Sequence, residues 1–180
     1  MKRIFWNADT QYDFVRDDDD YKGNMYVPAA EVIEPKLKEL TKLAKKKKIF
    51  VINTGNWHAA ETNEVSSNPD FKETFPPHCL QGTKGLEFIP ATKPTDTYEI
   101  NWKDKEIDKE RIKKHKNLVL YKQKFNIFDE FPHIDEILDH LKPEEVVVYG
   151  LPTSLSIDPV VKGLLKRKIK VTVVLDAIKG

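Results

Sequence analysis

The chain has 180 residues, 39% of them hydrophobic, with 30 lysines and arginines against 29 aspartates and glutamates. This length favours one well-buried domain, and a net charge of +1 gives no long-range attraction for nucleic acid. A single cysteine excludes an intramolecular disulfide, and no apolar run approaches the roughly 20 residues that a membrane-spanning helix needs. The first residues show no signal-peptide pattern. We therefore expect a cytoplasmic protein without a nucleic-acid or membrane partner.

Five short runs rich in β-branched or aromatic residues predict buried strands. Nearly continuous apolar runs of this kind are typical of parallel strands that are covered on both faces. The runs are residues 4–6, 49–52, 118–121, 146–149 and 171–175.

Helical periodicity appears between these runs. Apolar residues recur every three or four positions in residues 33–44, 134–141 and 160–165, which places each set on one helix face. The almost wholly charged residues 103–116 are predicted to form a solvated helix. Strands that alternate with helices predict an α/β fold with three α/β/α layers, in which a mostly parallel open sheet carries helices on both faces.

Residues 54–94 follow neither period and contain five prolines. A loop of this length in a compact domain is usually functional or disordered. This one contains Trp57, His58, Phe75 and His78 together with the single cysteine, Cys79, and we expect it to be functional.

Chemically reactive side chains follow several of the predicted strands. The first strand leads to Asp9, the second to residues 56–58, the third to Lys122, and the fourth to a turn that ends at Ser156. Ligands of open α/β sheets bind beyond the carboxyl ends of the strands. An acid and a lysine beside a hydroxyl at a helix start could activate a nucleophile. A charged residue at a strand end is more often a solvated terminus, so the prediction depends on convergence of these side chains.

The bond between Leu151 and Pro152 is a second feature of the fourth turn. A cis peptide bond here would direct backbone amides into the site, where they could hold an oxyanion. An ordinary trans proline at a helix start is the alternative.

Five motifs resemble those of the isochorismatase-like cysteine hydrolases, and within them the nicotinamidase branch. They occur in the family's order and with its gaps. They are "DTQYDF" (9–14), "TGNWH" (54–58), "FPPHCLQGTKG" (75–85), "KQKFNIF" (122–128) and "YGLPTSLS" (149–156). The resemblance implies a single isochorismatase-like hydrolase domain over residues 1–180.

The resemblance implies a set of catalytic residues. Asp9 takes the position of the catalytic acid, Lys122 that of the lysine, and Ser156 that of the nucleophile, where the family has cysteine. Leu151 and Pro152 fall at the family's cis peptide, whose backbone amides hold the oxyanion. Because a serine hydroxyl is far less acidic than a thiol of pKa about 8.5, the change to serine predicts a loss of several orders of magnitude in rate.

The resemblance also implies a metal site. Asn56, His58 and His78 fall at the ligand positions for a divalent metal, zinc or iron, although the family has aspartate where this chain has Asn56. An amide oxygen offsets a cation's charge less than a carboxylate does, so the change weakens the predicted site. Glu61 or Glu64 is a candidate for a further ligand.

The remaining expectations concern the substrate. By the resemblance, Phe14 and Phe75 would enclose a flat ring such as a pyridine, while Cys79 is a neighbour of the metal ligand without a chemical role. The sequence thus predicts a nicotinamidase-like amidohydrolase that converts nicotinamide to nicotinate and ammonia, with activity compromised by Ser156. One alternative is an inactive relative that binds a ligand or partner. The other is an isochorismatase-type hydrolase, against which the proline-histidine loop argues. The expected partners are a small amide substrate and, as in many family members, further copies of the chain.

Overall fold

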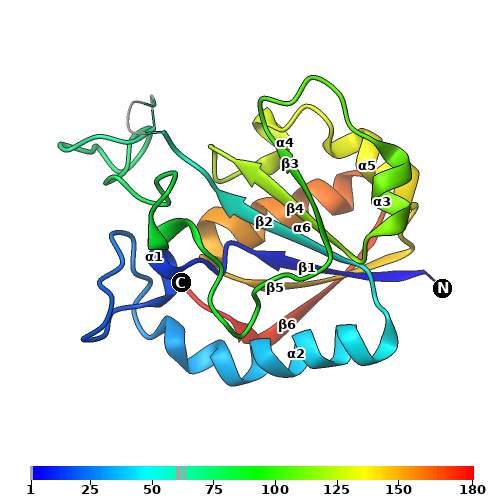
Figure 1. The fold of residues 1–180 in the computed structure, drawn as a ribbon, viewed down its shortest axis with the longest axis horizontal. Coiled ribbons are helices and arrows are strands. Elements are labelled where there is room, and N and C mark those ends of the chain that lie inside the picture. The colour runs from blue at the N-terminus through cyan, green and yellow to red at the C-terminus, as the bar shows by residue number, and fades with distance from the viewer. Residues whose placement is uncertain (1, 60–61, 63) are drawn as a thin grey trace.

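The computed structural model describes residues 2–59, 62 and 64–180. In this part of the chain six parallel strands form one sheet in the order β3-β4-β2-β1-β5-β6 (Figure 1). The strands are β1 (Arg3–Ala8), β2 (Val51–Asn56), β3 (Thr97–Asn101), β4 (Asn117–Lys122), β5 (Glu145–Gly150) and β6 (Lys170–Ile178).

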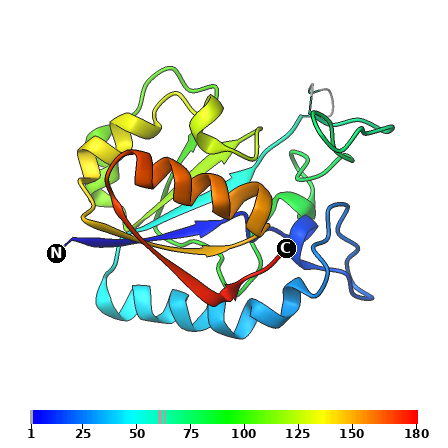
Figure 2. The same cartoon turned by 180° about the vertical axis from the view of Figure 1, so that it is seen from behind.

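Helices lie on both faces of the sheet, which confirms the predicted three-layer α/β/α class (Figures 1 and 2). The α-helices are α1 (Tyr12–Val15), α2 (Glu34–Lys47), α3 (Lys109–Lys114), α4 (Ile127–Glu130), α5 (Ile134–Leu141) and α6 (Asp158–Lys166). Shorter turns are η1 (Ala30–Ile33), η2 (Lys84–Leu86) and the π-helical η3 (Thr153–Ile157).

Two apolar clusters fill the space between the layers. One lies between α2 and the sheet face that carries Phe5, Val51 and Val147. The other lies under α3 to α6, against the face that carries Trp6 and Ile52. Successive residues of a strand point to opposite faces, so each central strand contributes to both clusters. This explains why their sequences are continuous apolar runs.

Local sequence explains where several helices begin and end. In α2, Leu37, Leu40 and Ala44 share the buried face, and the helix ends where Lys48 takes a left-handed conformation with φ 54°. The side chain of Asp108 accepts hydrogen bonds from two backbone N–H groups at the start of α3, and Asn126 caps α4 in the same way.

The two edge strands differ from the sequence prediction. β3 was not predicted, because its residues alternate between buried and exposed, with Glu99 exposed, and form no continuous apolar run. β6 was predicted within residues 171–175 as a strand covered on both faces. The structure corrects this: β6 is a partly exposed edge strand that pairs only with β5, and Leu175 is 79% exposed.

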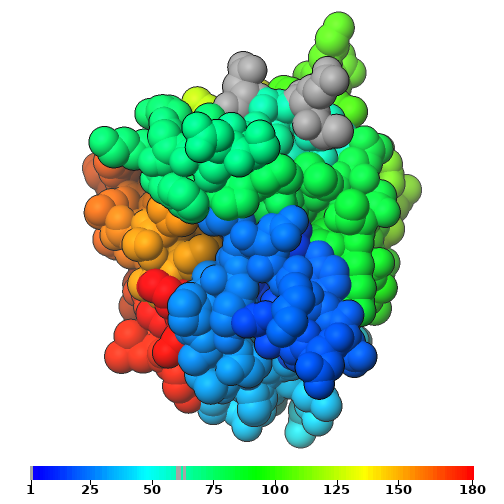
Figure 3. Space-filling view, turned by 90° about the vertical axis from the view of Figure 1, so that its left-hand side faces the viewer, coloured from blue at the N-terminus to red at the C-terminus, as the bar shows by residue number. Residues whose placement is uncertain are grey.

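Long connections cover the carboxyl ends of the strands. Residues 64–85 and residues 16–30 form much of the surface at this end of the molecule (Figure 3). The first of these connections is irregular apart from the short turn η2, as the sequence predicted for residues 54–94, but residues 54–56 of that predicted loop belong to β2. No helix in the described ranges has the length and apolar character needed to cross a bilayer.

Candidate active site

Asp9 follows β1 directly and lies wholly buried at the carboxyl end of the sheet. Its backbone has a φ of 52°, a left-handed conformation that is uncommon for residues other than glycine. The N–H of Asp9 donates to the Thr54 carbonyl at 2.9 Å, and the N–H of Gln11 donates to the Asp9 carbonyl at 2.8 Å. These bonds hold the sharp turn after the strand.

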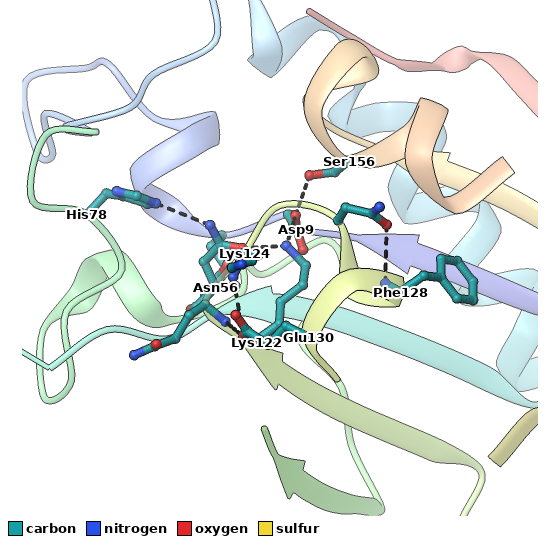
Figure 4. A network of polar contacts seen from close by, with 11 residues as sticks. Asp9, Asn56, His78, Lys122, Lys124, Phe128, Glu130 and Ser156 are labelled. Atoms are coloured by element: carbon teal, nitrogen blue, oxygen red, sulfur yellow. Dashed lines mark hydrogen bonds and ion pairs between the residues drawn. The ribbon is translucent and has the colours of Figure 1, made fainter. Parts of the chain in front are cut away.

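The structure brings Asp9, Lys122 and Ser156 together. Lys122 Nζ donates to Asp9 Oδ2 at 2.8 Å, and Ser156 Oγ donates to the same oxygen at 2.6 Å (Figure 4). Each of the three residues is no more than 1% exposed. Away from water, a carboxylate and an ammonium interact strongly, and each offsets the cost of burying the other. One oxygen of Asp9 is therefore in contact with both the ammonium and the Ser156 hydroxyl.

The turn after β5 positions Ser156. The bond between Leu151 and Pro152 is cis, and the N–H of Ser156 donates to the Pro152 carbonyl at 2.9 Å. Gly150, at φ 119°, passes so close to β1 that a Cβ added to it would lie 2.1 Å from the Ala8 carbonyl oxygen. Only glycine fits this approach, which brings the start of η3 up to Asp9.

The prediction that Leu151 and Pro152 supply oxyanion donors is not supported. Proline has no backbone N–H. The N–H of Leu151 donates to the Ala8 carbonyl at 3.0 Å and is therefore already engaged in linking β5 to β1. An oxyanion at this site needs other donors.

Asn56, at the end of β2, joins this cluster to His78. Lys122 Nζ donates to Asn56 Oδ1 at 2.5 Å, and Asn56 Nδ2 lies 3.1 Å from His78 Nε2 (Figure 4). An ammonium can only donate, so the amide oxygen must face Lys122 and the NH₂ group must face His78. His78 Nδ1 donates in turn to the Pro76 carbonyl at 2.7 Å, which leaves Nε2 as the acceptor. In this series of hydrogen bonds, from Lys122 to the Pro76 carbonyl, each donor therefore meets an acceptor.

The two histidines lie side by side and are uncharged at neutral pH. Their ring centroids are 4.6 Å apart. Burial lowers the pKa of both, and that of His58 falls to about 3, with smaller contributions from His78 and Lys122. His58 Nε2 is buried without a hydrogen-bond partner among the described residues.

These residues do not fit a divalent metal in this arrangement. A metal needs lone pairs directed at one point, but the His78 Nε2 lone pair faces the Asn56 NH₂ group and the Asn56 oxygen faces Lys122. Only His58 Nε2 is uncommitted. Among the described residues, no group of three or more His, Cys, Asp or Glu side chains is arranged to hold a metal ion. A zinc or iron centre at Asn56, His58 and His78 stays a prediction.

Comparison with known proteins identifies a shared fold. No protein-family model matches the chain. A stretch of 41 residues is 37% identical to the nicotinamidase/pyrazinamidase of Mycobacterium tuberculosis, which covers 23% of this chain and 22% of that protein. The matched stretch therefore spans only about a fifth of the length of each protein.

Solved structures match the whole chain. The nicotinamidase/pyrazinamidase of Bacillus subtilis superimposes with a TM-score of 0.75 at 17% identity, covering 100% of this chain and 87% of that one. The pyrazinamidase of Pyrococcus horikoshii, in complex with zinc, gives 0.74 at 22% identity, with coverage of 100% and 87%. An isochorismatase family protein from Desulfovibrio vulgaris gives 0.76 at 19% identity, with coverage of 99% and 82%. The chain has the isochorismatase-like fold.

Within this isochorismatase-like fold, two buried polar residues that sequence reasoning left without a role hold the site in place. Gln11 Oε1 accepts from the Asn56 N–H at 2.7 Å, and Gln11 Nε2 donates to the Asn56 carbonyl at 2.8 Å. Asp13 Oδ2 accepts from the Cys79 N–H at 2.6 Å, while its other oxygen accepts from the Tyr21 hydroxyl at 2.7 Å. Both residues lie in the "DTQYDF" motif, and membership of this motif is the sequence signal that could have identified them as site residues.

Aromatic side chains gather beside His78. The rings of Phe14 and Phe75 both contact Phe125, with centroid distances of 6.1 Å and 4.9 Å. Phe125 also stacks on His78 at 5.9 Å, with 7° between the ring planes, and the Lys122 ammonium lies 5.5 Å from its centroid. Phe125 therefore belongs to the aromatic wall, and the roles of Phe14 and Phe75 in binding a ring stay a prediction.

The structure also describes two of the three other residues that the sequence singled out near the predicted metal site. Cys79 is fully buried in the apolar cluster under α2, and burial raises the pKa of its thiol well above the ordinary value, which makes it a poor nucleophile. Glu64 is half-buried. Burial, together with the nearby Glu130, raises the pKa of its carboxyl to about 7. Glu61 lies outside the described residues.

Proposed function

We propose that this protein is a hydrolase of small primary amides and that Ser156 is its nucleophile. The observation that carries the proposal is the bonding of Asp9 Oδ2, which accepts from both Ser156 Oγ and Lys122 Nζ. A carboxylate held against an ammonium and in contact with a hydroxyl is a unit for proton transfer and nucleophilic attack. The shared fold and the names of the relatives support the amide as the class of substrate.

The proposed reaction has two halves. In the first, the Ser156 proton passes to Asp9 Oδ2 while Oγ forms a bond to the amide carbon. Asp9 then gives the proton to the leaving nitrogen, the carbon-nitrogen bond breaks, and ammonia departs. In the second half a water molecule loses a proton to Asp9 and attacks the acyl carbon, and the proton returns to Ser156 as the ester bond breaks. Lys122 keeps Asp9 in contact with the reacting oxygen in both halves.

The oxyanion of each tetrahedral intermediate needs donors near Ser156. The N–H groups of Ser154 and Leu155, in the first turn of η3, make no hydrogen bond among the described residues. Unpaired N–H groups at the start of a helical turn are suited to an anion. We assign this role to them in place of Leu151 and Pro152.

The proposed substrate carries a flat ring. Phe14, Phe75 and Phe125 border the site with His78, and aromatic walls favour a flat aromatic guest at roughly 1 kcal/mol per ring. Nicotinamide and pyrazinamide are the first substrates to test, because their hydrolases share the fold.

The test is ammonia release from nicotinamide by the purified protein and its Ser156→Cys variant. We expect slow release by the natural chain and a rate higher by at least about a thousandfold with cysteine, because a thiol is the better nucleophile for this base. Ser154→Cys is the matched control, because it adds a thiol to the same turn at an exposed position and keeps the backbone N–H to which the oxyanion role is assigned. No release by any of the three proteins would contradict the proposal.

One alternative has observations of its own. Serine at the nucleophile position, the closed Asn56–His78 contact and the engaged Leu151 N–H all favour a binding protein that has lost catalysis. Saturable binding of nicotinamide without hydrolysis by Ser156→Cys would select it. Isochorismatase-type hydrolysis stays a prediction. Among the described residues, no hydrogen bond or ring contact favours it over amide hydrolysis.

A further inference from the structure

A cavity lies on the face of the sheet that α2 covers. It has a volume of about 330 Å³ and is bounded by the second half of α2, by residues 92–96 and by the strand surface. Figure 1 shows α2 and the segment that leads into β3 on this side of the sheet. Asp9, Lys122 and Ser156 do not line this space, which we call the α2 cavity. Its volume is within the range of small-molecule sites, roughly 300–1,000 Å³.

The floor of the α2 cavity is polar where a strand interior is usually apolar. Asn7 and Asn53 are only 1% and 2% exposed and occupy core-facing positions of β1 and β2. Asn7 Nδ2 donates to Asn53 Oδ1 at 3.1 Å, and Asn53 Nδ2 donates to the Leu118 carbonyl at 3.0 Å. Amides fixed in this way form a rigid polar surface under the cavity.

Tyr149 lines the same cavity and is left without a polar partner. The residue is 1% exposed, and its hydroxyl makes no hydrogen bond among the described residues. A hydroxyl that lines a cavity and has no protein partner can form a hydrogen bond with a molecule bound there. Burial raises the pKa of Tyr149, so the hydroxyl stays protonated and can donate. A ligand with an acceptor atom would satisfy it.

Cations surround the entrance to the α2 cavity. Lys45, Lys48 and Lys116 line it and form no salt bridge with any carboxylate in the described part of the chain. A fourth lysine, Lys93, has only a long, exposed contact with Glu87 at 3.4 Å. The one carboxylate in the lining, Asp96, pairs with His115 at 2.9 Å. The entrance therefore has an excess of positive charge that would attract an anion.

We propose that the α2 cavity binds a small organic anion, a carboxylate or a phosphate monoester, whose uncharged part enters toward Tyr149 and Asn53. The anionic group would lie among the lysines at the entrance, and the Tyr149 hydroxyl would donate to the part inside. A cavity of this volume accommodates one small molecule, which favours a metabolite over a polyanion. This binding site is independent of the hydrolase function proposed above.

The first test is a titration of the ¹⁵N-labelled full chain with benzoate, phenyl phosphate and the neutral benzyl alcohol, which carries no amide, followed by amide resonances. We expect saturable shifts at Asn53, Thr92 and Lys93 with at least one anion, and binding of benzyl alcohol weaker by at least about fivefold. Benzoate alone would identify a carboxylate ligand, and phenyl phosphate alone a phosphate ester. Shifts confined to the residues around Asp9 and Asn56, or no saturation by either anion, would overturn the proposal.

Variants separate the α2 cavity from general surface charge. Changing both Lys48 and Lys116 to Gln should weaken the anion's binding by about fivefold or more, because two unpaired charges are removed from the entrance. Lys38→Gln, at an exposed position of α2 outside the cavity lining, is the control and should leave the affinity unchanged. Tyr149→Phe should weaken binding about threefold without unfolding the protein. Equal affinities of the natural chain and the double lysine variant would refute the assignment.

Discussion

The two parts of the candidate site differ in how their hydrogen bonds are used. Around Asp9, two donors converge on a single carboxylate oxygen, and the other oxygen, Oδ1, has no partner among the described residues. Around His78, each donor meets an acceptor, from Lys122 through Asn56 to the Pro76 carbonyl. The first part is arranged to move a proton, whereas in the second the hydrogen bonds from Lys122 to the Pro76 carbonyl are complete and only the neighbouring His58 Nε2 is without a partner among the described residues. We infer from this contrast that Asn56 controls whether the second part can accept a metal.

The largest expected effect tests the first part. Ser156→Cys should raise the rate of ammonia release by at least about a thousandfold, since Asp9 can deprotonate a thiol far more readily than a hydroxyl. The measurement is the steady-state rate with nicotinamide, with Ser154→Cys assayed in parallel.

The link between the two parts is Lys122. Lys122→Met should lower the free energy of unfolding by about 3–5 kcal/mol, because it leaves the buried Asp9 charge and the Asn56 oxygen without their cation. Urea denaturation measures the change. Lys124→Met, an exposed neighbour on the same segment, should alter stability by less than about 0.5 kcal/mol. Similar unfolding midpoints for the two variants would show that the ion pair contributes little.

Asn56→Asp should convert the second part into a metal site. A carboxylate cannot donate to His78 Nε2, so that lone pair becomes available together with His58 Nε2. We expect zinc to bind at least about a hundredfold more tightly than to the natural chain, as measured by calorimetry. Adding His78→Ala should abolish the gain. Tight zinc binding by the natural chain would mean that Asn56 rotates in solution.

The two neutral histidines predict an acid sensitivity. Burial lowers the pKa of His58 to about 3 in the folded state, whereas the ordinary pKa of histidine is 6.5. Below pH 6.5 the unfolded chain therefore binds more protons than the folded chain. Stability should therefore fall as the pH decreases from 6.5 toward 3, by about 1.4 kcal/mol per pH unit for a single such histidine. Unfolding midpoints of the natural chain and His58→Gln should converge over this range. His115→Gln, at a partly exposed histidine, serves as the control.

The smallest effect concerns the aromatic wall. Phe125→Leu should raise the KM for nicotinamide about fivefold while kcat changes less, because it removes ring contacts with Phe75 and His78 and not the reacting groups. The assay needs the Ser156→Cys background for a measurable rate. A change confined to kcat would instead place Phe125 near the reacting atoms.

Sequence predicted the central sheet well and its edges less well. The runs in β1, β2, β4 and β5 are apolar because both of their faces are covered, whereas β3 and β6 have exposed residues and weaker patterns. The positions of Asp9, Lys122 and Ser156 followed from strand ends that meet at one edge.

Other features of the site depend on contacts between segments far apart in sequence. The engagement of the Leu151 N–H by Ala8, and of His78 by Asn56, could not be read from local pattern. The polar residues Asn7 and Asn53 inside apolar strands were a visible signal of the α2 cavity, because stability alone favours apolar side chains there.

Gly150 contributes no chemical group, yet the distance between acid and nucleophile depends on it. Its hydrogen atom occupies a place where any carbon would collide with the Ala8 carbonyl, so a larger residue must push the end of β5 away from β1. Ser156, a few residues later, would move with it and lose its contact with Asp9. In a saturation-mutagenesis screen for hydrolysis, position 150 should tolerate substitution as poorly as position 9.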